Sequence, residues 1–313
     1  MKRLALIKDI TKLWTVYKPV LEKHNIDVVT LDIFNHKDRQ VLLEGKWDAF
    51  IWRAKHDPLI RNLAKRFIYL FDKELGIKTF PSWDSYWFYD DKIAQYYLMK
   101  QKNVPTPKTY IFFYVEEAMQ FLSTAKYPLV YKCPSGAGSA NVGLLKNRAK
   151  AERYARKAIK KGVETYFKED FQKGYVYFQE YLENNFGDYR LVCNKNERIH
   201  AFLREPNKNG FASGSDKWNF DNIPEDLLLF VTDAHQKLGN NLVMSYDVMK
   251  DNGGRWVITE MSVVFADLDG WSGDEPIPNF KINSDRTFTQ IQNKENDHIF
   301  FINYLLKEWG WVD

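Results

Sequence analysis

The chain has 313 residues, of which 45% are hydrophobic and 27% charged, and its formal net charge is +4. This composition is typical of folded globular proteins and excludes a disordered or fibrous chain. No apolar run approaches the ~18 residues of a membrane-spanning helix, and the two cysteines form neither a metal-site spacing nor a disulfide framework. We therefore expect a soluble, cytoplasmic protein without a membrane partner.

The first region, residues 1–87, alternates short apolar runs with helical stretches. The expected strands are residues 3–9, 27–33 and 48–53, and the expected helices are residues 13–24 and 59–75. This alternation is typical of a small α/β domain with a largely parallel sheet. Arg53 ends the third strand, where α/β sheets commonly present ligand contacts. It is our candidate for holding a substrate carboxylate, and a structural salt bridge is the alternative.

The second region, residues 88–182, mixes helices and strands. A helix over residues 91–101 is closed by Val104-Pro105-Thr106-Pro107, which cannot continue it. The expected strands that follow are residues 109–113, 128–133, 142–145 and 176–182, with helices over 116–124 and 149–161. The last of these helices is strongly basic, which fits a solvated helix face or, alternatively, a surface for an anionic partner.

The third region, residues 183–313, is rich in strands. The expected strands are residues 189–194, 199–204, 243–250 and 256–261, and the expected helices are residues 225–238 and 297–309. The three regions together indicate an α/β (α+β) protein with three lobes.

A loop of small residues follows Lys132, which stands at the end of an apolar strand. The loop contains Ser135, Gly136, Ala137, Gly138 and Ser139. Small residues let backbone N–H groups approach an anion, and a neighbouring lysine supplies positive charge. The spacing is not that of a P-loop. The alternative is an ordinary flexible hairpin.

Two acidic residues are expected on neighbouring strands of the third region. Asp247 lies in an apolar strand and Glu260 in the next one, and the Asp251–Gly254 turn between them predicts an antiparallel hairpin. Two buried carboxylates need a counterion. Mg2+ that is shared with nucleotide phosphates is one solution, and pairing with Arg or Lys is the other.

Arginine and glutamate side chains offer further candidate contacts. The planar forks of Arg190 and Arg204 suit a carboxylate or a phosphate, although a surface ion pair is the alternative for both. Glu180, offered from the edge of the strand over residues 176–182, could form hydrogen bonds with the edge of an adenine together with free backbone groups beside it. An ordinary amphipathic strand explains the same residues.

The series from Asp91 to Glu260 resembles, in its order, the ATP-grasp superfamily. It is most similar to the branch of RimK-like and related amino-acid ligases. The resemblance implies an ATP-grasp fold in which residues 1–87 form the N-terminal pre-grasp α/β domain. Residues 88–182 would then be the lid subdomain with its leading helix, and residues 183–313 the C-terminal subdomain with the metal site.

The resemblance also implies a nucleotide site. Lys92 and Lys132 would bind the phosphates, and the loop with Ser135, Gly136, Gly138 and Ser139 would cover them. The adenine hinge would consist of Gln179, Glu180, Tyr181 and Leu182, with Glu180 accepting the N6 amino group. Asp188 would contact the ribose.

The metal and the reacting phosphate would lie beside this nucleotide site. The resemblance implies that Asp247 and Glu260 bind Mg2+, together with Ser262, which stands where the family usually has Asn. Arg204 would lie near the transferred phosphate, and Arg190 is a further candidate for the catalytic site.

The implied activity is that of an ATP- and Mg2+-dependent carboxylate–amine ligase that releases ADP and forms an acylphosphate intermediate. Small-molecule or peptide acids and amines are compatible substrates. A phosphotransferase on the same fold and a non-catalytic nucleotide-binding module are the alternatives. A nucleic-acid partner is not expected, because proteins that bind nucleic acids usually concentrate their basic residues in one patch. The oligomeric state is open.

Overall fold

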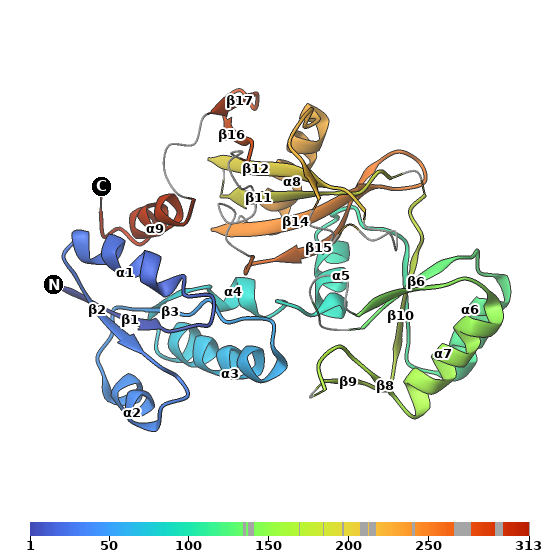
Figure 1. Ribbon diagram of the computed structural model, residues 1–313, viewed down its shortest axis with the longest axis horizontal. Helices are drawn as coiled ribbons and strands as arrows, with labels where there is room; N and C mark the ends of the chain where they lie inside the picture. The colour runs from blue at the N-terminus through green and yellow to red at the C-terminus, as the bar shows by residue number, and fades with distance from the viewer. Residues whose placement is uncertain are drawn as a thin grey trace.

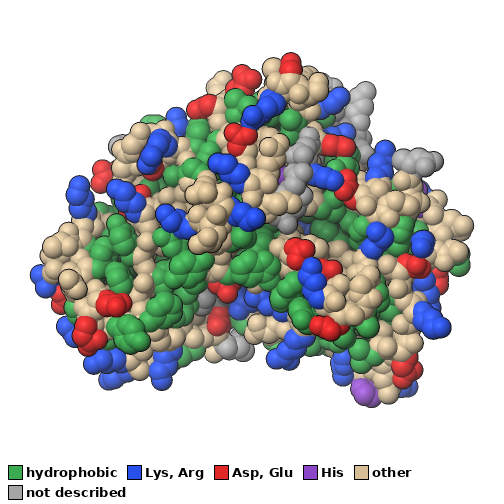
Figure 2. All heavy atoms as spheres, turned by 180° about the vertical axis from the view of Figure 1, so that it is seen from behind, with side chains coloured by type: hydrophobic (Ala, Val, Ile, Leu, Met, Phe, Trp, Pro, Cys, Tyr) green, Lys and Arg blue, Asp and Glu red, His purple; other side chains and the backbone are tan. Residues whose placement is uncertain are grey.

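The structure is a computed structural model. It describes residues 1–133, 136, 141–168, 170–183, 185–195, 197–206, 212, 217–239, 242–265, 277–291 and 297–312. Within these ranges the chain forms three main sheets, each with its own covering helices, and one small hairpin (Figure 1). On the face shown in Figure 2, Lys and Arg side chains are dispersed among Asp and Glu. None of the helices in the described part of the chain is long and apolar enough to cross a membrane.

The N-terminal region is a parallel sheet with helices packed on it. Its strand order is β2-β1-β3-β4, with β1 Lys2–Ile7, β2 Ile26–Leu31, β3 Ala49–Ile51 and β4 Lys78–Phe80. Its helices are α1 Trp14–Lys23, α2 His36–Glu44, α3 Pro58–Tyr69, a π-helical turn over Leu70–Glu74, and the short α4 Trp83–Tyr86. The predicted parallel sheet is therefore confirmed.

Local capping explains where two of these helices begin. The Asp57 carboxylate accepts the N–H groups of Leu59 and Ile60 at distances of 3.0 and 3.2 Å, and Pro58 occupies the first turn of α3. Asn35 caps α2 in the same way. Sequence analysis missed α2 because Leu42 is its one buried residue, so the helix has no apolar stripe to detect.

The lid sheet is antiparallel, in the order β5-β10-β6-β7. These strands are β5 Thr109–Phe112, β10 Val176–Glu180, β6 Leu129–Lys132 and β7 Val142–Leu145. Helices α6 Val115–Thr124 and α7 Arg148–Lys160 cover one face (Figure 1), and a small hairpin pairs β8 Val163–Glu164 with β9 Phe171–Gln172. Helix α7 buries Ala151, Ala155 and Ala158 and exposes its basic residues, as a solvated helix face does.

The C-terminal sheet has the order β15-β14-β11-β12-β16-β17, and β13 pairs with β12. Its strands are β11 Asp188–Asn194, β12 Arg198–Arg204, β13 Trp218–Asn219, β14 Val243–Lys250, β15 Trp256–Ser262, β16 Asn279–Ile282 and β17 Phe288–Ile291. Helix α8 (Glu225–Lys237) packs on the face that carries Leu191, Met244 and Tyr246. The other face carries Val192 and Phe202, which share a core with β1 and with α9 (Asp297–Glu308).

Strand β15 is where the segment before the lid sheet meets the C-terminal sheet. Helix α5 (Lys92–Gln101) lies beside it, and the Gln95 side-chain oxygen accepts the Met261 N–H at 3.2 Å. The Ile258 N–H donates to the Pro105 carbonyl at 3.0 Å, so the proline turn after α5 also pairs with this strand. Helix α5 and the proline turn, which precede the lid sheet in sequence, are thereby fixed against the C-terminal sheet. This contact sets the position of Lys92.

Candidate active site

The two predicted acidic residues lie directly opposite each other. Strands β14 and β15 pair in antiparallel fashion, and Asp247 and Glu260 are register partners. The register shifts just beyond this pair, because the next partners are Val248 and Ile258. Thr259 is therefore the extra residue of a β-bulge. A bulge beside the two carboxylates turns the Thr259 carbonyl out of the regular ladder.

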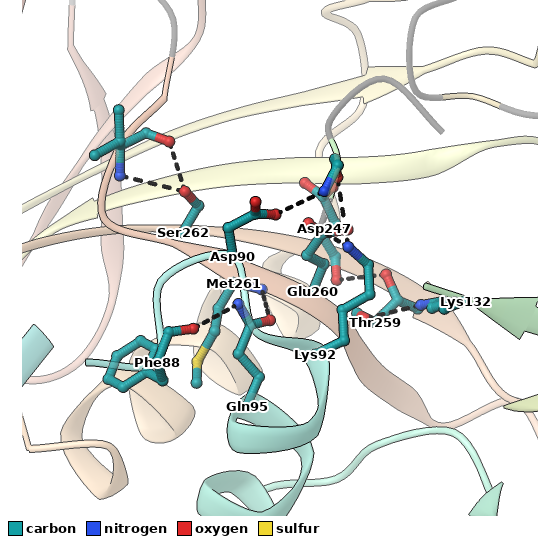
Figure 3. Close-up of polar contacts among 12 residues, drawn as sticks. Phe88, Asp90, Lys92, Gln95, Lys132, Asp247, Thr259, Glu260, Met261 and Ser262 are labelled. Carbon is teal, nitrogen blue, oxygen red and sulfur yellow. Dashed lines mark hydrogen bonds and ion pairs between the residues drawn. The ribbon is translucent and has the colours of Figure 1, made fainter. Parts of the chain in front are cut away.

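Two lysines from different elements reach this pair of strands. Lys132, at the end of lid strand β6, donates to the Thr259 carbonyl at 3.1 Å. The Lys92 Nζ, at the start of α5, lies 3.7 Å from Glu260 Oε1 and 3.4 Å from the Gly136 carbonyl. Figure 3 shows both lysine side chains directed at the bulge and at Glu260. The lid lysines and the acidic strands therefore face one another, as predicted.

The electrostatic environments of the two lysines differ. Burial lowers the pKa of Lys132 to about 8, although the charge of Glu260 opposes this shift. Burial also acts on Lys92, but the neighbouring carboxylates of Glu260 and Asp90 outweigh it and raise the Lys92 pKa above its ordinary value. Two buried cations beside partly exposed Glu260 make this place suitable for an anion.

Arg190 and Arg204 form a largely buried network with two aspartates. Arg190 holds Asp247 with two hydrogen bonds of 2.8 and 2.9 Å. Arg204 holds Asp188 with bonds of 2.6 and 2.8 Å, and its Nη2 also lies 2.7 Å from Asp247. Burial raises the pKa of Asp247, but the two guanidinium groups outweigh this and hold it well below its usual range. Asp247 is thus ionised and doubly paired.

A further buried ion pair, which sequence analysis missed, holds the start of α5. Arg61 on α3 lies 2.5 Å from Asp90, and the Asp90 Oδ1 accepts the Gly136 N–H at 3.0 Å. Burial raises the pKa of Asp90, and the charges of Lys92 and Arg61 oppose the shift. Gly136 is therefore held by Asp90 through its N–H and by Lys92 through its carbonyl. The one sequence signal for the ion pair of Asp90 was the presence of two consecutive aspartates before α5. The second of them, Asp91, is the helix cap.

The predicted adenine hinge connects the lid to the C-terminal sheet. The Glu180 Oε1 accepts the Lys108 N–H at 2.9 Å. The predicted hydrogen bond from the adenine N6 amino group would therefore use the other oxygen of this carboxylate. Gln179 is buried and donates to the Thr109 hydroxyl at 3.0 Å, which places its amide in the lid. The Tyr181 carbonyl accepts the Asn252 side chain, so the hinge is tied to the turn between β14 and β15. Leu182 is buried beside it.

Two other predicted residues, Ser262 and Arg53, have hydrogen-bond partners of their own, and their predicted roles stay predictions. The Ser262 hydroxyl donates to the Val264 carbonyl at 2.5 Å and accepts the Val264 N–H, so it closes a local turn (Figure 3). Arg53 is buried at the junction of the N-terminal domain with α9 and contacts Phe265. Ser135, Gly138 and Ser139 lie outside the described residues.

The carboxylates at this place suit an Mg2+ ion whose other ligands come from nucleotide phosphates and water. Among the described residues, no group of three or more His, Cys, Asp or Glu side chains is gathered closely enough to hold a metal ion. Mg2+ needs only one or two protein carboxylates when phosphates and water complete its shell. The Glu260 side chain is 31% exposed and its contact with Lys92 is long, so this carboxylate can turn to a cation. Both oxygens of Asp247 are held by Arg190 and Arg204, so this carboxylate shows the pairing with arginine that was the alternative to a metal, and its part in binding Mg2+ stays a prediction.

Comparisons with known proteins give one consistent fold. No protein-family profile and no curated protein matches the sequence. Among solved structures, the D-cycloserine synthetase DcsG superposes with a TM-score of 0.63 at 15% identity, over 98% of this chain and 99% of that one. D-alanine–D-alanine ligase from Bacillus anthracis gives a TM-score of 0.61 at 12% identity, covering 98% of this chain and 97% of its own.

A third neighbour is the RimK-domain ATP-grasp protein from Sphaerobacter thermophilus DSM 20745. Its TM-score is 0.57 at 15% identity, over 86% of this chain and 94% of that one. These likenesses show the ATP-grasp fold, as the resemblance in sequence implied. The chain is therefore a mixed α/β protein with the ATP-grasp fold.

Proposed function

We propose that the protein is an ATP-dependent ligase that joins a carboxylate to an amine and releases ADP. The observation that carries the proposal is the meeting of Lys92 and Lys132 with the Asp247–Glu260 pair, because phosphoryl transfer needs cations and metal-binding carboxylates in one place. Neighbours of the same fold support the choice of reaction. They include D-alanine–D-alanine ligase and the ATP-grasp ligase PsnB, and the latter was solved with Mg and ADP.

In this proposal ATP lies between the lid and the C-terminal sheet. Lys132 leaves the Thr259 carbonyl and Lys92 leaves Glu260, and both bind phosphate oxygens. Gly136 offers its N–H to the phosphates in place of Asp90, together with the loop that contains Ser135, Gly138 and Ser139. The adenine meets Glu180 and the hinge, and the ribose meets Asp188. These ligand assignments and the domain boundaries at residues 87 and 182 are predictions.

Mg2+ fits beside Glu260 and Asp247, where it would neutralise phosphate charge and orient the γ-phosphate. The protein groups then act by position and charge. Arg204 and Arg190 bind the transferred phosphate or the attacking carboxylate, and the two aspartates fix their orientation. The substrate carboxylate attacks the γ-phosphorus and ADP leaves. The amine then attacks the acylphosphate carbonyl, and inorganic phosphate leaves with one oxygen of the carboxylate.

A screen of acid and amine pairs for ADP release tests this proposal. An active pair, repeated with an acid labelled with 18O in its carboxylate, should place one label in inorganic phosphate. A kinase would instead leave phosphate on a hydroxyl of its product, with no free phosphate. The Glu260→Gln variant is the control for the site, and turnover that survives this change would remove the metal assignment.

A further inference from the structure

Asp90 is a buried carboxylate whose two oxygens have partners in different parts of the chain. Its Oδ2 accepts a hydrogen bond of 2.5 Å from Arg61, which belongs to α3 of the N-terminal region. Its Oδ1 accepts the N–H of Gly136 at 3.0 Å, and Gly136 lies between the lid strands β6 and β7. Asp91 caps α5 by accepting the Ala94 N–H at 3.0 Å, so the backbone beside Asp90 is fixed by the start of this helix.

The backbone of Gly136 is suited to an anion. Its φ is 124°, in the region that favours glycine, and a Cβ at this position would lie 2.7 Å from the Asn141 side-chain nitrogen. A residue without a Cβ lets an anion come close to its N–H group. Lys92 Nζ lies 3.4 Å from the carbonyl of the same residue (Figure 3). These are two of the donors that the proposed function assigns to the ATP phosphates.

Asp90 and a phosphate would therefore use the same donors. The Gly136 N–H is a single donor, and Asp90 Oδ1 accepts it. The charges of Asp90 and Lys92 also act on each other. A phosphate that binds to Gly136 must break the bond to Asp90, and it must also overcome the repulsion between its own charge and this carboxylate.

Arg61 gives Asp90 a partner that does not depend on the lid. Its Nη1 donates to the Asp90 carboxylate and lies 3.3 Å from the carbonyl of the same residue. Its Nη2 lies 4.0 Å from Asp170, which directly precedes β9. Because an unpaired carboxylate is costly to bury, the pair with Arg61 makes it easier for Gly136 to leave Asp90.

We propose that Asp90 competes with the nucleotide phosphates for the Gly136 N–H and for Lys92, and that Arg61 limits this competition by holding the carboxylate. The two residues then set how tightly the protein binds ATP. This inference rests on the proposed function, because it takes the site to be one for nucleotide phosphates. Since Arg61 lies on α3, the inference assigns the N-terminal region a part in nucleotide affinity.

Calorimetric titration with Mg2+ and a non-hydrolysable ATP analogue tests the inference without any turnover. Asp90→Asn keeps the shape of the side chain but removes its charge, so this variant should bind the analogue about 10-fold more tightly than the wild type. Arg61→Met leaves the carboxylate to Gly136 and Lys92, so it should bind the analogue about 10-fold more weakly. A general loosening of the fold would weaken binding in both variants, and it cannot give opposite shifts.

Asp91→Asn is the matched control, because it removes an equal charge from the neighbouring residue and asparagine also caps helices well. It should leave the affinity for the analogue unchanged. The inference is overturned if Asp90→Asn binds no more tightly than the wild type, or if Asp91→Asn gains as much affinity. It is also overturned if Arg61→Met binds as tightly as the wild type or more so.

A second variant covers the case in which Asp90→Asn does not fold. Asp90→Asn combined with Arg61→Met removes both buried charges, so no ion is left without its partner. This double variant should also bind the analogue more tightly than the wild type, and weaker binding would overturn the inference. The affinity of the wild type for the analogue is measured first, and a lack of binding would count against the proposed function instead.

Discussion

Lys132 donates its ammonium hydrogen to the main-chain carbonyl of Thr259, across a distance of 3.1 Å that joins the lid to the C-terminal sheet. The two residues are 127 positions apart in the chain. Thr259 can accept this bond because it is the extra residue of the bulge between Asp247 and Val248. The contact holds Lys132 close to Asp247 and Glu260, whose charges both act on it.

The first prediction concerns the pH dependence of nucleotide binding. Since burial lowers the pKa of Lys132 to about 8, the lysine loses its charge as the pH rises above that value. ATP affinity should therefore fall above pH 8, and ATP bound near pH 8.5 should take up a fraction of a proton, because phosphate favours the charged form. Calorimetry in buffers with different ionisation heats measures this uptake. Binding without proton uptake would contradict the assignment of Lys132.

Lys132 also predicts how the free energy of unfolding depends on pH, and this trend is opposite to that of ATP affinity. The pKa of Lys132 is about 8 in the folded protein and ordinarily 10.5. Between these values the unfolded chain binds more protons than the folded one, so the contribution of Lys132 to stability rises with pH. Denaturant titrations from pH 7.5 to 10 should show that Lys132→Met removes this part of the pH dependence. If the free energy of unfolding of Lys132→Met changed with pH as that of the wild type does, this prediction would be wrong.

The second prediction uses Gly187, which stands next to Asp188. A Cβ at Gly187 would lie 2.0 Å from the Arg204 carbonyl oxygen, and this backbone cannot move without shifting Arg204. Gly187→Ala should therefore cost about 2–4 kcal/mol of stability and weaken ATP turnover. Gly174→Ala is the matched control, because Gly174 also has a positive φ but meets nothing within 4 Å. It should cost about 1 kcal/mol and leave turnover unchanged. Equal effects in thermal unfolding would contradict the steric argument.

The third prediction separates Asp247 from Glu260, the two carboxylates of the proposed metal site. Asp247→Asn leaves Arg190 and Arg204 short of a counterion, which should destabilise the protein by about 3–5 kcal/mol. Glu260 is partly exposed and has one long ion pair, so Glu260→Gln should cost less than about 1 kcal/mol. Both changes should lower ADP release by about 100-fold or more. A fully active and stable Asp247→Asn protein would show that this network is neither structural nor catalytic.

Much of this fold was predictable from local patterns. The apolar strands around Asp247 and Glu260 and the turn between them were enough to predict an antiparallel pair with the two acids together. The strand that ends at Lys132 was equally clear. Helix α2 and the short strands β16 and β17 were missed, because few of their side chains are buried and their patterns are weak.

The partners of the site residues were not predictable, because they depend on contacts between distant parts of the chain. His298 meets Tyr17 across 281 positions and Arg53 across 245. Arg61 and Asp90 belong to a helix and a loop that sequence alone does not bring together. The Ser262 hydroxyl is also satisfied by Val264, two residues further on, and a turn of that kind leaves no periodic signal.

The position of a bound nucleotide tests the central claim most directly. A crystal structure with Mg2+ and a non-hydrolysable ATP analogue should place the phosphates between the Lys92 and Lys132 ammonium groups and the Asp247–Glu260 pair. The metal should lie about 2.1 Å from a Glu260 oxygen, and Lys132 should no longer contact the Thr259 carbonyl. A nucleotide bound elsewhere, with the contact between Lys132 and Thr259 intact, would contradict the account.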